Sequence, residues 1–190
     1  GGECFVERSR ESARTADLIV TNHALVAINA MHGGTALPEH DALIIDEAHE
    51  LMGRLTTAAT GELSAGVAER VVKRCLAWLD DELGGDLLDA VEELHDALAD
   101  SPTGRITGVD VPLPVACAGL RHASRRAISD LGKDRDNPER SQAAGALGEI
   151  FDISERIARL ADQDVVWVSR SDGIGETAHV APLSVAGLLR

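Results

Sequence analysis

The sequence predicts a mainly α-helical protein with a small α/β part. Apolar residues recur at helical spacing through most of residues 61–163, whereas short β-branched or wholly apolar runs lie toward the two ends of the chain. With 190 residues, of which 44% are hydrophobic, the chain is long enough to form one good core or two small ones. These observations are typical of a globular α/β core that is interrupted by a set of helices.

The first 60 residues carry the α/β part. Good helix formers with mixed charges fill residues 7–17, and the β-branched run at 18–21 predicts a short strand. Helical spacing resumes over 22–30, and a loop marked by Gly and Pro leads to residues 42–45, which are apolar at every position. Such a run is typical of a parallel strand that is covered on both faces. Two strands joined by a helix predict a βαβ unit.

Four amphipathic helices are predicted in the middle of the chain. Because each helix needs the others to bury its apolar stripe, residues 61–163 are expected to form a helical subdomain. The last segment, 164–190, is β-rich around a glycine turn. The predicted domains are therefore 1–60, 61–163 and 164–190. The apolar stripes of the helices lie at 63–79, 87–98, 113–131 and 147–160, with loops at 101–112 and 132–140.

The charge distribution argues against nucleic-acid binding by the whole surface. The formal net charge is -14, and phosphate contacts need clustered Lys and Arg. Residues 61–100 carry eleven acidic and three basic residues, whereas residues 101–140 carry seven basic and five acidic residues. Any DNA-facing patch on this chain is therefore expected in the second stretch rather than the first.

The sequence also lacks the signs of a membrane span and of a disulfide framework. No apolar stretch reaches the roughly 18 residues that a membrane helix needs, and no leader resembles a signal peptide, so we expect a cytoplasmic location and no membrane partner. Cys4, Cys75 and Cys117 lie far apart and form no CxxC pair, which predicts neither disulfides nor a zinc site. Cys75 and Cys117 are expected to be small buried residues.

The segment ALIIDEAHEL at residues 42–51 carries the strongest chemical signal. Asp46 is the first polar residue after the apolar run. In open α/β sheets ligands bind beyond the carboxyl ends of the strands, where one carboxylate can reach Mg²⁺ on a phosphate. Glu47 could orient the water that attacks a γ-phosphate or accept its proton, and His49 could sense the nucleotide by hydrogen bonding. The alternative is an ordinary helix start, where Asp and Glu favour the positive end of the helix dipole.

Several segments resemble the iron-sulfur helicases of superfamily 2, of the XPD and DinG type. LIIDEAHEL (43–51) resembles their Walker B motif, and ADLIVTNHALV (16–26) resembles the segment shortly upstream of it. ECFVERSRESARTAD (3–17) resembles the run that follows the fourth cluster-binding cysteine, which would make Cys4 that ligand. The tail at 165–189 resembles, more weakly, the return from the family's arch domain into its first motor domain. By position, the helices between these segments take the role of the arch.

The resemblance implies an incomplete RecA-like helicase motor domain interrupted by a helical arch insert. It implies a parent protein that moves 5′ to 3′ on single-stranded or forked DNA in repair or replication, with ATP, Mg²⁺ and a 4Fe-4S cluster as cofactors. Asp46 would then hold Mg²⁺, Glu47 would activate water, and His49 would couple the nucleotide state to DNA.

The chain also departs from the family pattern. It has no GxxxxGK[ST] loop, which cradles phosphates in P-loop enzymes, and it lacks the other three cluster cysteines and the second motor domain. We therefore expect an excised fragment that by itself neither hydrolyses ATP nor holds an iron-sulfur cluster.

Other residues keep two interpretations. Arg121, Arg125 and Arg126 on the third predicted helix could follow a DNA backbone, but short basic runs also form ordinary solvated helix faces. Asn22 and His23 follow the end of a predicted strand and could approach DNA or nucleotide. Capping of the next helix by Asn22 explains much of the same pattern.

A rival function from another class is a non-catalytic module. In that interpretation the acidic helices within residues 62–100 form a protein-docking or regulatory surface, and the DEAH segment is vestigial. The chain has two Trp, two Phe and no Tyr, so it offers few platforms on which bases could stack. A P-loop lysine upstream of the chain would favour the helicase, and its absence would favour the module.

Overall fold

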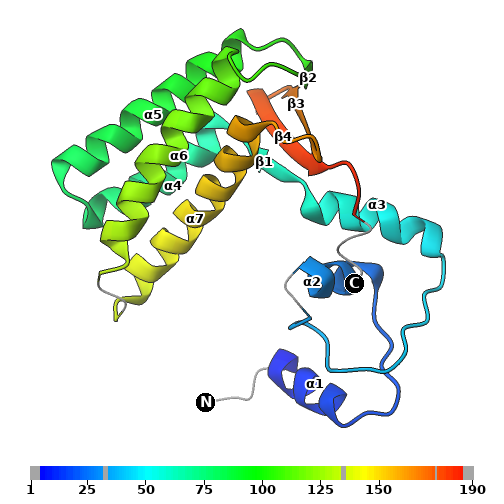
Figure 1. The fold of residues 1–190 in the computed structure, drawn as a ribbon. Helices are drawn as coiled ribbons and strands as arrows, with labels where there is room; N and C mark the ends of the chain where they lie inside the picture. The colour runs from blue at the N-terminus through cyan, green and yellow to red at the C-terminus, as the bar shows by residue number, and fades with distance from the viewer. Residues whose placement is uncertain (1–4, 32–33, 134–135, 174, 186–190) are drawn as a thin grey trace. The chain divides into compact units, whose positions relative to one another are not determined.

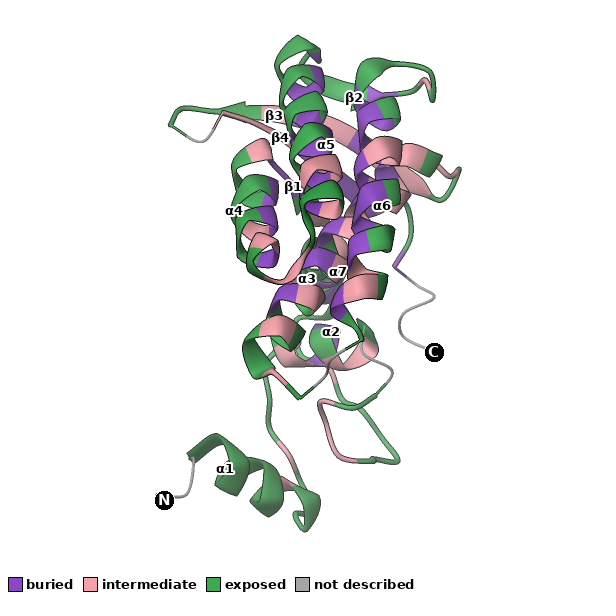
Figure 2. Cartoon of the chain, turned by 90° about the vertical axis from the view of Figure 1, so that its left-hand side faces the viewer, coloured by how far each residue is buried: buried purple, intermediate pink, exposed green. Residues whose placement is uncertain are grey.

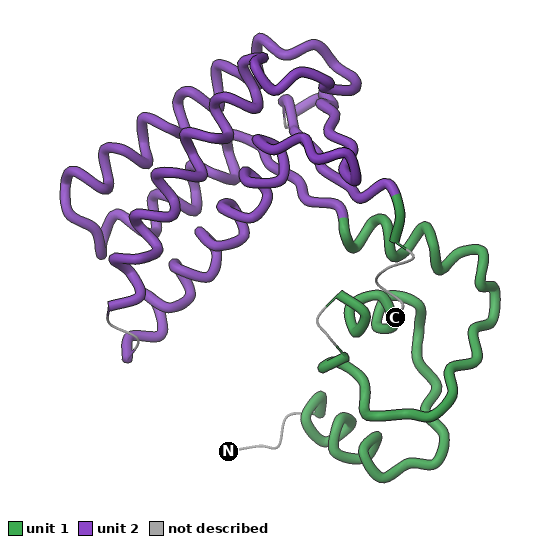
Figure 3. Tube along the Cα trace, viewed as in Figure 1, with its two compact units in different colours: residues 1–59, 184–190 green, residues 60–183 purple. Residues whose placement is uncertain are grey.

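The computed structural model describes residues 5–31, 34–133, 136–173 and 175–185. Its contacts divide the chain into two compact units, which we call unit 1 and unit 2 (Figure 3). Unit 1 comprises residues 1–59 and 184–190, and unit 2 comprises residues 60–183. The two ends of the chain therefore belong to one unit, and the middle of the chain forms the other.

The described part of unit 1 contains the helices α1 (Phe5–Arg14), α2 (His23–Met31) and α3 (Ala48–Ala59) (Figure 1). The helices predicted at 7–17 and 22–30 correspond to α1 and α2 and are confirmed. Helices α2 and α3 pack against each other around a small apolar core, to which a residue from the C-terminal segment contributes. The buried members of this core are Val26, Ala27, Leu51, Leu55 and Val185.

The prediction of two strands in the first 60 residues is wrong. Residues 18–21 and 42–45 are not strands, and neither segment joins a sheet in the part of unit 1 that the structure describes. Ile44 is 94% exposed, whereas Ile45 packs against the core of α2 and α3. A strand needs neighbours that exchange ladder hydrogen bonds with it, and no described segment of unit 1 pairs with these runs in this way. The predicted βαβ unit is therefore not formed.

The predicted helices of the middle segment are confirmed in unit 2. They are α4 (Ala65–Cys75), which continues into the short 3₁₀ helix η1 (Leu76–Trp78), α5 (Asp81–Asp100), α6 (Pro112–Leu131) and α7 (Pro138–Arg159). Asp80 and Asn137 cap α5 and α7, because their side-chain oxygens accept hydrogen bonds from backbone N–H groups of the first turn. Figure 2 shows the buried residues of α5 and α6 as stripes along each helix. The amphipathic pattern in the sequence thus corresponds to real packing.

A four-stranded antiparallel sheet completes unit 2. Its strands are β1 (Gly61–Leu63), β2 (Gly104–Ile106), β3 (Asp164–Ser171) and β4 (Gly175–Pro182), in the order β1-β4-β3-β2. The β-rich tail predicted around a glycine turn corresponds to the β3–β4 hairpin and is confirmed. The loop predicted at 101–112 is wrong in part, because it contains β2. Strands β1 and β2 have three residues each and are too short to give an alternating pattern in the sequence.

The helices and the sheet of unit 2 share one apolar core. Alternate residues of the strands, including Leu63, Val166 and Val180, join the buried residues of α4 to α7. Strand β1 opens the unit and pairs with β4, which ends it, with Gly61 opposite Val180. The chain therefore enters and leaves unit 2 on neighbouring strands.

Polar contacts secure two helix ends in this unit. Arg140 of α7 donates hydrogen bonds to the backbone oxygens of Asp130 and Leu131, at 2.8 and 2.9 Å, and so caps the last turn of α6. Arg156 of α7 forms an ion pair with Asp164 at the start of β3, with an N–O distance of 2.7 Å. Both arginines lie at points where the chain changes from one element to the next.

The two described cysteines are buried in the core of unit 2, as predicted, and are free thiols. Burial raises the pKa of Cys75 to about 11 and that of Cys117 to about 12. Both thiols are therefore protonated at neutral pH. Cys4 lies outside the described residues. Among the helices that the structure describes, none is long and apolar enough to cross a membrane.

Replacing Gly61 tests the close approach of β1 to α7. A Cβ at this position would lie 2.9 Å from Cγ1 of Ile153 and 3.2 Å from Cγ1 of Val180. We expect Gly61→Ala to lower the free energy of unfolding by about 1–3 kcal/mol, because an overpacked core must shift. The control is Gly145→Ala inside α7, where a Cβ meets nothing within 4 Å and helix propensity predicts a gain of about 0.5–1 kcal/mol. Urea unfolding of both variants measures the difference, and equal stabilities would contradict the packing.

Candidate functional site

Residues 46–49, which we call the DEAH turn, join the segment 42–45 to helix α3 and include the first two residues of that helix. Asp46 and Glu47 form a turn, and α3 begins at Ala48. Glu47 has a φ of 48°, in the left-handed region that residues with a side chain rarely adopt. The backbone N–H of Glu50 donates a 2.8 Å hydrogen bond to the backbone oxygen of Glu47. The turn thus holds a sparsely populated backbone conformation at a residue predicted to be catalytic.

The predicted residues of the DEAH turn are brought together at the surface. Nδ1 of His49 lies 3.3 Å from Oε2 of Glu47, and both side chains are well exposed, at 75% and 65%. Asp46 directly precedes Glu47, and its carboxylate accepts a 3.0 Å hydrogen bond from the backbone N–H of Glu47. Two neighbouring carboxylates and an imidazole therefore face solvent, where they can reach a cation, a water molecule or a phosphate.

The first residue of α2 contacts the DEAH turn through its side chain. Nε2 of His23 lies 2.8 Å from the backbone oxygen of Asp46, so the ring nitrogen must donate this hydrogen bond. The preceding residue, Asn22, accepts a 2.9 Å hydrogen bond from the backbone N–H of Leu25. The predicted capping of α2 by Asn22 is therefore confirmed. The sequence pointed to His23 but gave no sign of its partner 23 residues later.

The donor set at the DEAH turn can be compared with what a metal ion needs. Within the described ranges, no group of three or more His, Cys, Asp or Glu residues is arranged to hold a metal ion. Mg²⁺, however, keeps several waters and takes one or two protein carboxylates together with substrate phosphates. A single exposed carboxylate such as that of Asp46 fits this partial role. The cluster ligand predicted at Cys4 lies outside the described residues.

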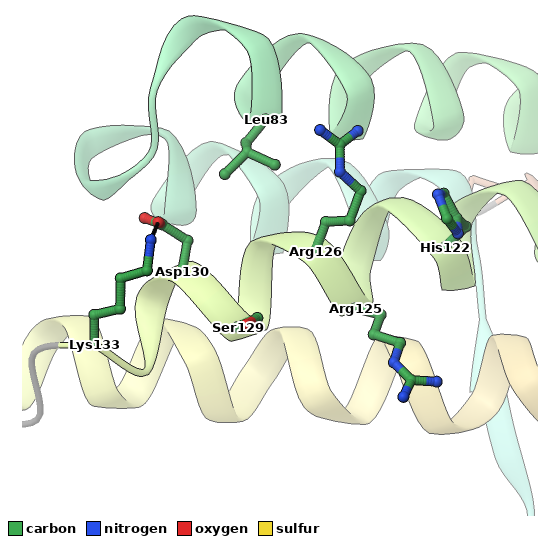
Figure 4. A pocket seen from close by; sticks show the side chains of 7 residues that line it. All are labelled: Leu83, His122, Arg125, Arg126, Ser129, Asp130 and Lys133. Atoms are coloured by element: carbon green, nitrogen blue, oxygen red, sulfur yellow. Dashed lines mark hydrogen bonds and ion pairs between the residues drawn. The ribbon is translucent and has the colours of Figure 1, made fainter.

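The predicted DNA-binding arginines of α6 do not share one environment. Arg126 reaches α5, where Nη2 lies 2.9 Å from Oε1 of Glu82 and Nη1 contacts Asp86. The hydrogen bond with Glu82 raises the pKa of Arg126. Figure 4 shows Arg126 pointing toward α5 and Arg125 pointing away from it. Reasoning from the sequence missed these ion pairs, although the spacing of Glu82 and Asp86, four residues apart, places both carboxylates on one face of α5.

A shallow groove of about 490 Å³ lies along α6 (Figure 4). Within this groove Lys133 pairs with Asp130, so part of the positive charge of the groove is already balanced. Arg121 is half-buried and does not line the groove. The lining residues are Leu83, His122, Arg125, Arg126, Ser129, Asp130 and Lys133.

A second groove of about 460 Å³ lies on the acidic side of unit 2. It runs between α4, α5 and the start of β4, and its lining combines apolar side chains such as Leu88 with carboxylates. Two of these carboxylates already have partners, because Glu69 pairs with Lys73 and Glu176 pairs with Arg170, each at 2.7 Å. The acidic stretch at 61–100 therefore carries a groove in addition to a solvated helix face.

Comparison with known proteins relates the chain to named helicases. A scan against protein-family models finds no match. Over its whole length, however, the chain is 39% identical across 202 aligned positions to the proteins named ATP-dependent helicase DinG of Mycobacterium tuberculosis and Mycobacterium bovis. The chain therefore corresponds in sequence to a part of the DinG helicases. It spans about 30% of the length of these DinG relatives.

A second comparison covers a shorter segment. Over 53 residues, which are 26% of the chain and 8% of the relative, the chain is 40% identical to the protein of Escherichia coli named ATP-dependent DNA helicase YoaA. The resemblance to DinG-type helicases that the sequence motifs indicated is therefore confirmed. The iron-sulfur ligand and the arch stay predictions.

Proposed function

We propose that the chain is part of an ATP-dependent DNA helicase and that the DEAH turn is the part of it that acts on nucleotide. The whole-length identity to the DinG helicases carries this proposal. The geometry of the turn supports it, because the carboxylates of Asp46 and Glu47 are adjacent, exposed and fixed to the start of α3. In this proposal the parent protein moves 5′ to 3′ on single-stranded or forked DNA in repair or replication.

Each side chain of the DEAH turn has a proposed role in ATP hydrolysis. The Asp46 carboxylate would hold Mg²⁺, which neutralises the charge that develops on the phosphates. The Glu47 carboxylate would orient the attacking water and accept its proton. His49, whose Nδ1 lies 3.3 Å from Oε2 of Glu47, would couple the nucleotide state to DNA. The phosphate cradle and the arginine finger would come from other parts of the parent protein.

We propose that unit 1 is part of the motor and that unit 2 contains the arch. The exposed apolar side chains of Leu18, Val20 and Ile44 support this view, because helices packed on both faces of a complete RecA-like sheet would cover them. The helices of the predicted arch at 61–163 lie in unit 2 together with β3 and β4. In this proposal the return to the motor lies within the predicted segment 164–190.

The proposed cofactors belong to the parent protein. ATP and Mg²⁺ follow from the helicase proposal, and a 4Fe-4S cluster with Cys4 as one ligand follows from the resemblance to the XPD and DinG type. The chain by itself lacks a GxxxxGK[ST] loop and three of the four expected cluster cysteines. We therefore propose that it is inactive and free of a cluster when it is isolated.

DNA is the proposed partner of α6. Arg121 and Arg125 are candidates for phosphate contacts, whereas Arg126 would have to exchange its carboxylate partners Glu82 and Asp86 for phosphate. The rival proposal, a docking module, is supported by the second groove in the acidic region and places a protein partner at residues 62–100. Binding of a protein but no DNA by unit 2 would favour the rival.

Replacing the proposed base tests the helicase function. In the full-length parent protein, Glu47→Gln keeps the size of the side chain and removes the carboxylate. We expect DNA-stimulated ATP turnover to fall by about 100-fold or more while nucleotide binding persists, because general-base catalysis typically contributes 10²–10⁴-fold. Steady-state ATP hydrolysis with and without single-stranded DNA, and binding of a fluorescent nucleotide, measure the two effects. Unchanged turnover in the variant would remove Glu47 from the mechanism.

Charge reversal on α6 tests the proposed DNA contacts. We expect the double variant Arg121→Glu, Arg125→Glu of the parent protein to bind single-stranded DNA more weakly and to show a smaller dependence of affinity on salt, by about one counterion per lost phosphate contact. The control is Arg159→Glu at the end of α7, an exposed arginine that pairs with Glu155. Fluorescence anisotropy at several salt concentrations gives both quantities. An unchanged affinity and salt slope would assign these arginines to a solvated helix face.

A further inference from the structure

The peptide group between Asp46 and Glu47 is held at both of its polar atoms. Its N–H, which belongs to Glu47, donates a 3.0 Å hydrogen bond to Oδ1 of Asp46. Its oxygen, which belongs to Asp46, accepts a 2.8 Å hydrogen bond from Nε2 of His23. The first bond is local, whereas the second comes from another helix. His23 is thus the side chain that fixes this peptide group to the rest of unit 1.

The orientation of this peptide group decides where the two carboxylates point. Rotating it changes ψ of Asp46 and φ of Glu47 together, and Glu47 already has a left-handed φ of 48°. A non-glycine residue persists in this region only when the surrounding structure holds it there. The hydrogen bond from His23 supplies such a restraint on the side opposite to the Asp46 carboxylate.

We propose that His23 is a positioning residue for the DEAH turn. It does not touch the reacting atoms, and it acts by holding the peptide plane from which the Asp46 and Glu47 side chains extend. This inference rests on the proposed function of the turn in ATP hydrolysis. A misplaced base or metal ligand lowers turnover because reaction needs near-attack geometry within a fraction of an ångström.

The contribution of His23 to folding is separable from this role. Helix α2 packs on α3 through buried apolar residues, including Val26 and Ala27, and Asn22 caps its first turn independently of His23. Loss of the His23 hydrogen bond therefore leaves the core of unit 1 in place. A defect confined to turnover is the expected signature.

The test uses a matched pair of substitutions in the full-length parent protein. Gln can place an N–H donor where Nε2 of His23 lies, whereas Glu has the same shape but offers only acceptors to the Asp46 oxygen. We expect His23→Gln to stay within about twofold of wild type. We expect His23→Glu to lower kcat by about tenfold or more with little change in KM for ATP, because the lost interaction positions reacting groups.

His40 provides the control, because its ring also bonds a backbone oxygen, but that of Pro38, at 2.9 Å, rather than one of the DEAH turn. We expect His40→Glu to retain wild-type turnover, and all three variants to melt near the wild-type temperature. If His23→Glu turns over like His40→Glu in a protein that Glu47→Gln inactivates, the positioning role is overturned and the helicase proposal stands. If Glu47→Gln leaves turnover unchanged, both proposals fail together.

Discussion

The pairing of β1 with β4 is the constraint on which the rest of the structure depends. These strands are the first and last elements of unit 2, and Gly61 opposite Val180 brings the entering and leaving chain side by side. A polypeptide that starts and ends at neighbouring strands can close its own core without help from the segments that flank it. The flanking segments can then share a separate core, as Leu55 and Val185 do in unit 1. The β1–β4 ladder thus explains why unit 2 can be inserted into the sequence of unit 1.

The DEAH turn shows how this arrangement bears on function. The side chains of His23, Asp46 and His49, which contact this turn or form part of it, all belong to unit 1. None of the hydrogen bonds described for the turn uses a residue of unit 2. The charged grooves of α5 and α6 lie wholly in unit 2. In the proposed function, the residues that act on nucleotide therefore lie in unit 1, and the candidate surfaces for macromolecular partners lie in unit 2.

The sequence was informative where local pattern decides structure. The apolar stripes at 87–98 and 113–131 predicted helices, because a helix that buries one face has apolar residues at helical spacing. It failed where structure depends on partners distant in the chain. The run at 42–45 has the composition of a buried strand but has no ladder neighbour among the described residues of unit 1, and the three residues of β1 acquire strand structure by pairing with β4. Likewise, the sequence singled out His23 and Arg126, but their bonds to Asp46 and Glu82 arise from packing of separate helices.

The equilibrium unfolding of residues 60–183, expressed as a separate polypeptide, tests the central claim most directly. An autonomous unit predicts helical circular dichroism, dispersed backbone amide resonances and one cooperative urea transition, because its core is complete without unit 1. It also predicts that Gly61→Ala lowers the midpoint of that transition, since β1 would then be an integral part of the unit. A polypeptide that shows no cooperative transition and poorly dispersed resonances would contradict the claim, because the β1–β4 ladder would then depend on unit 1.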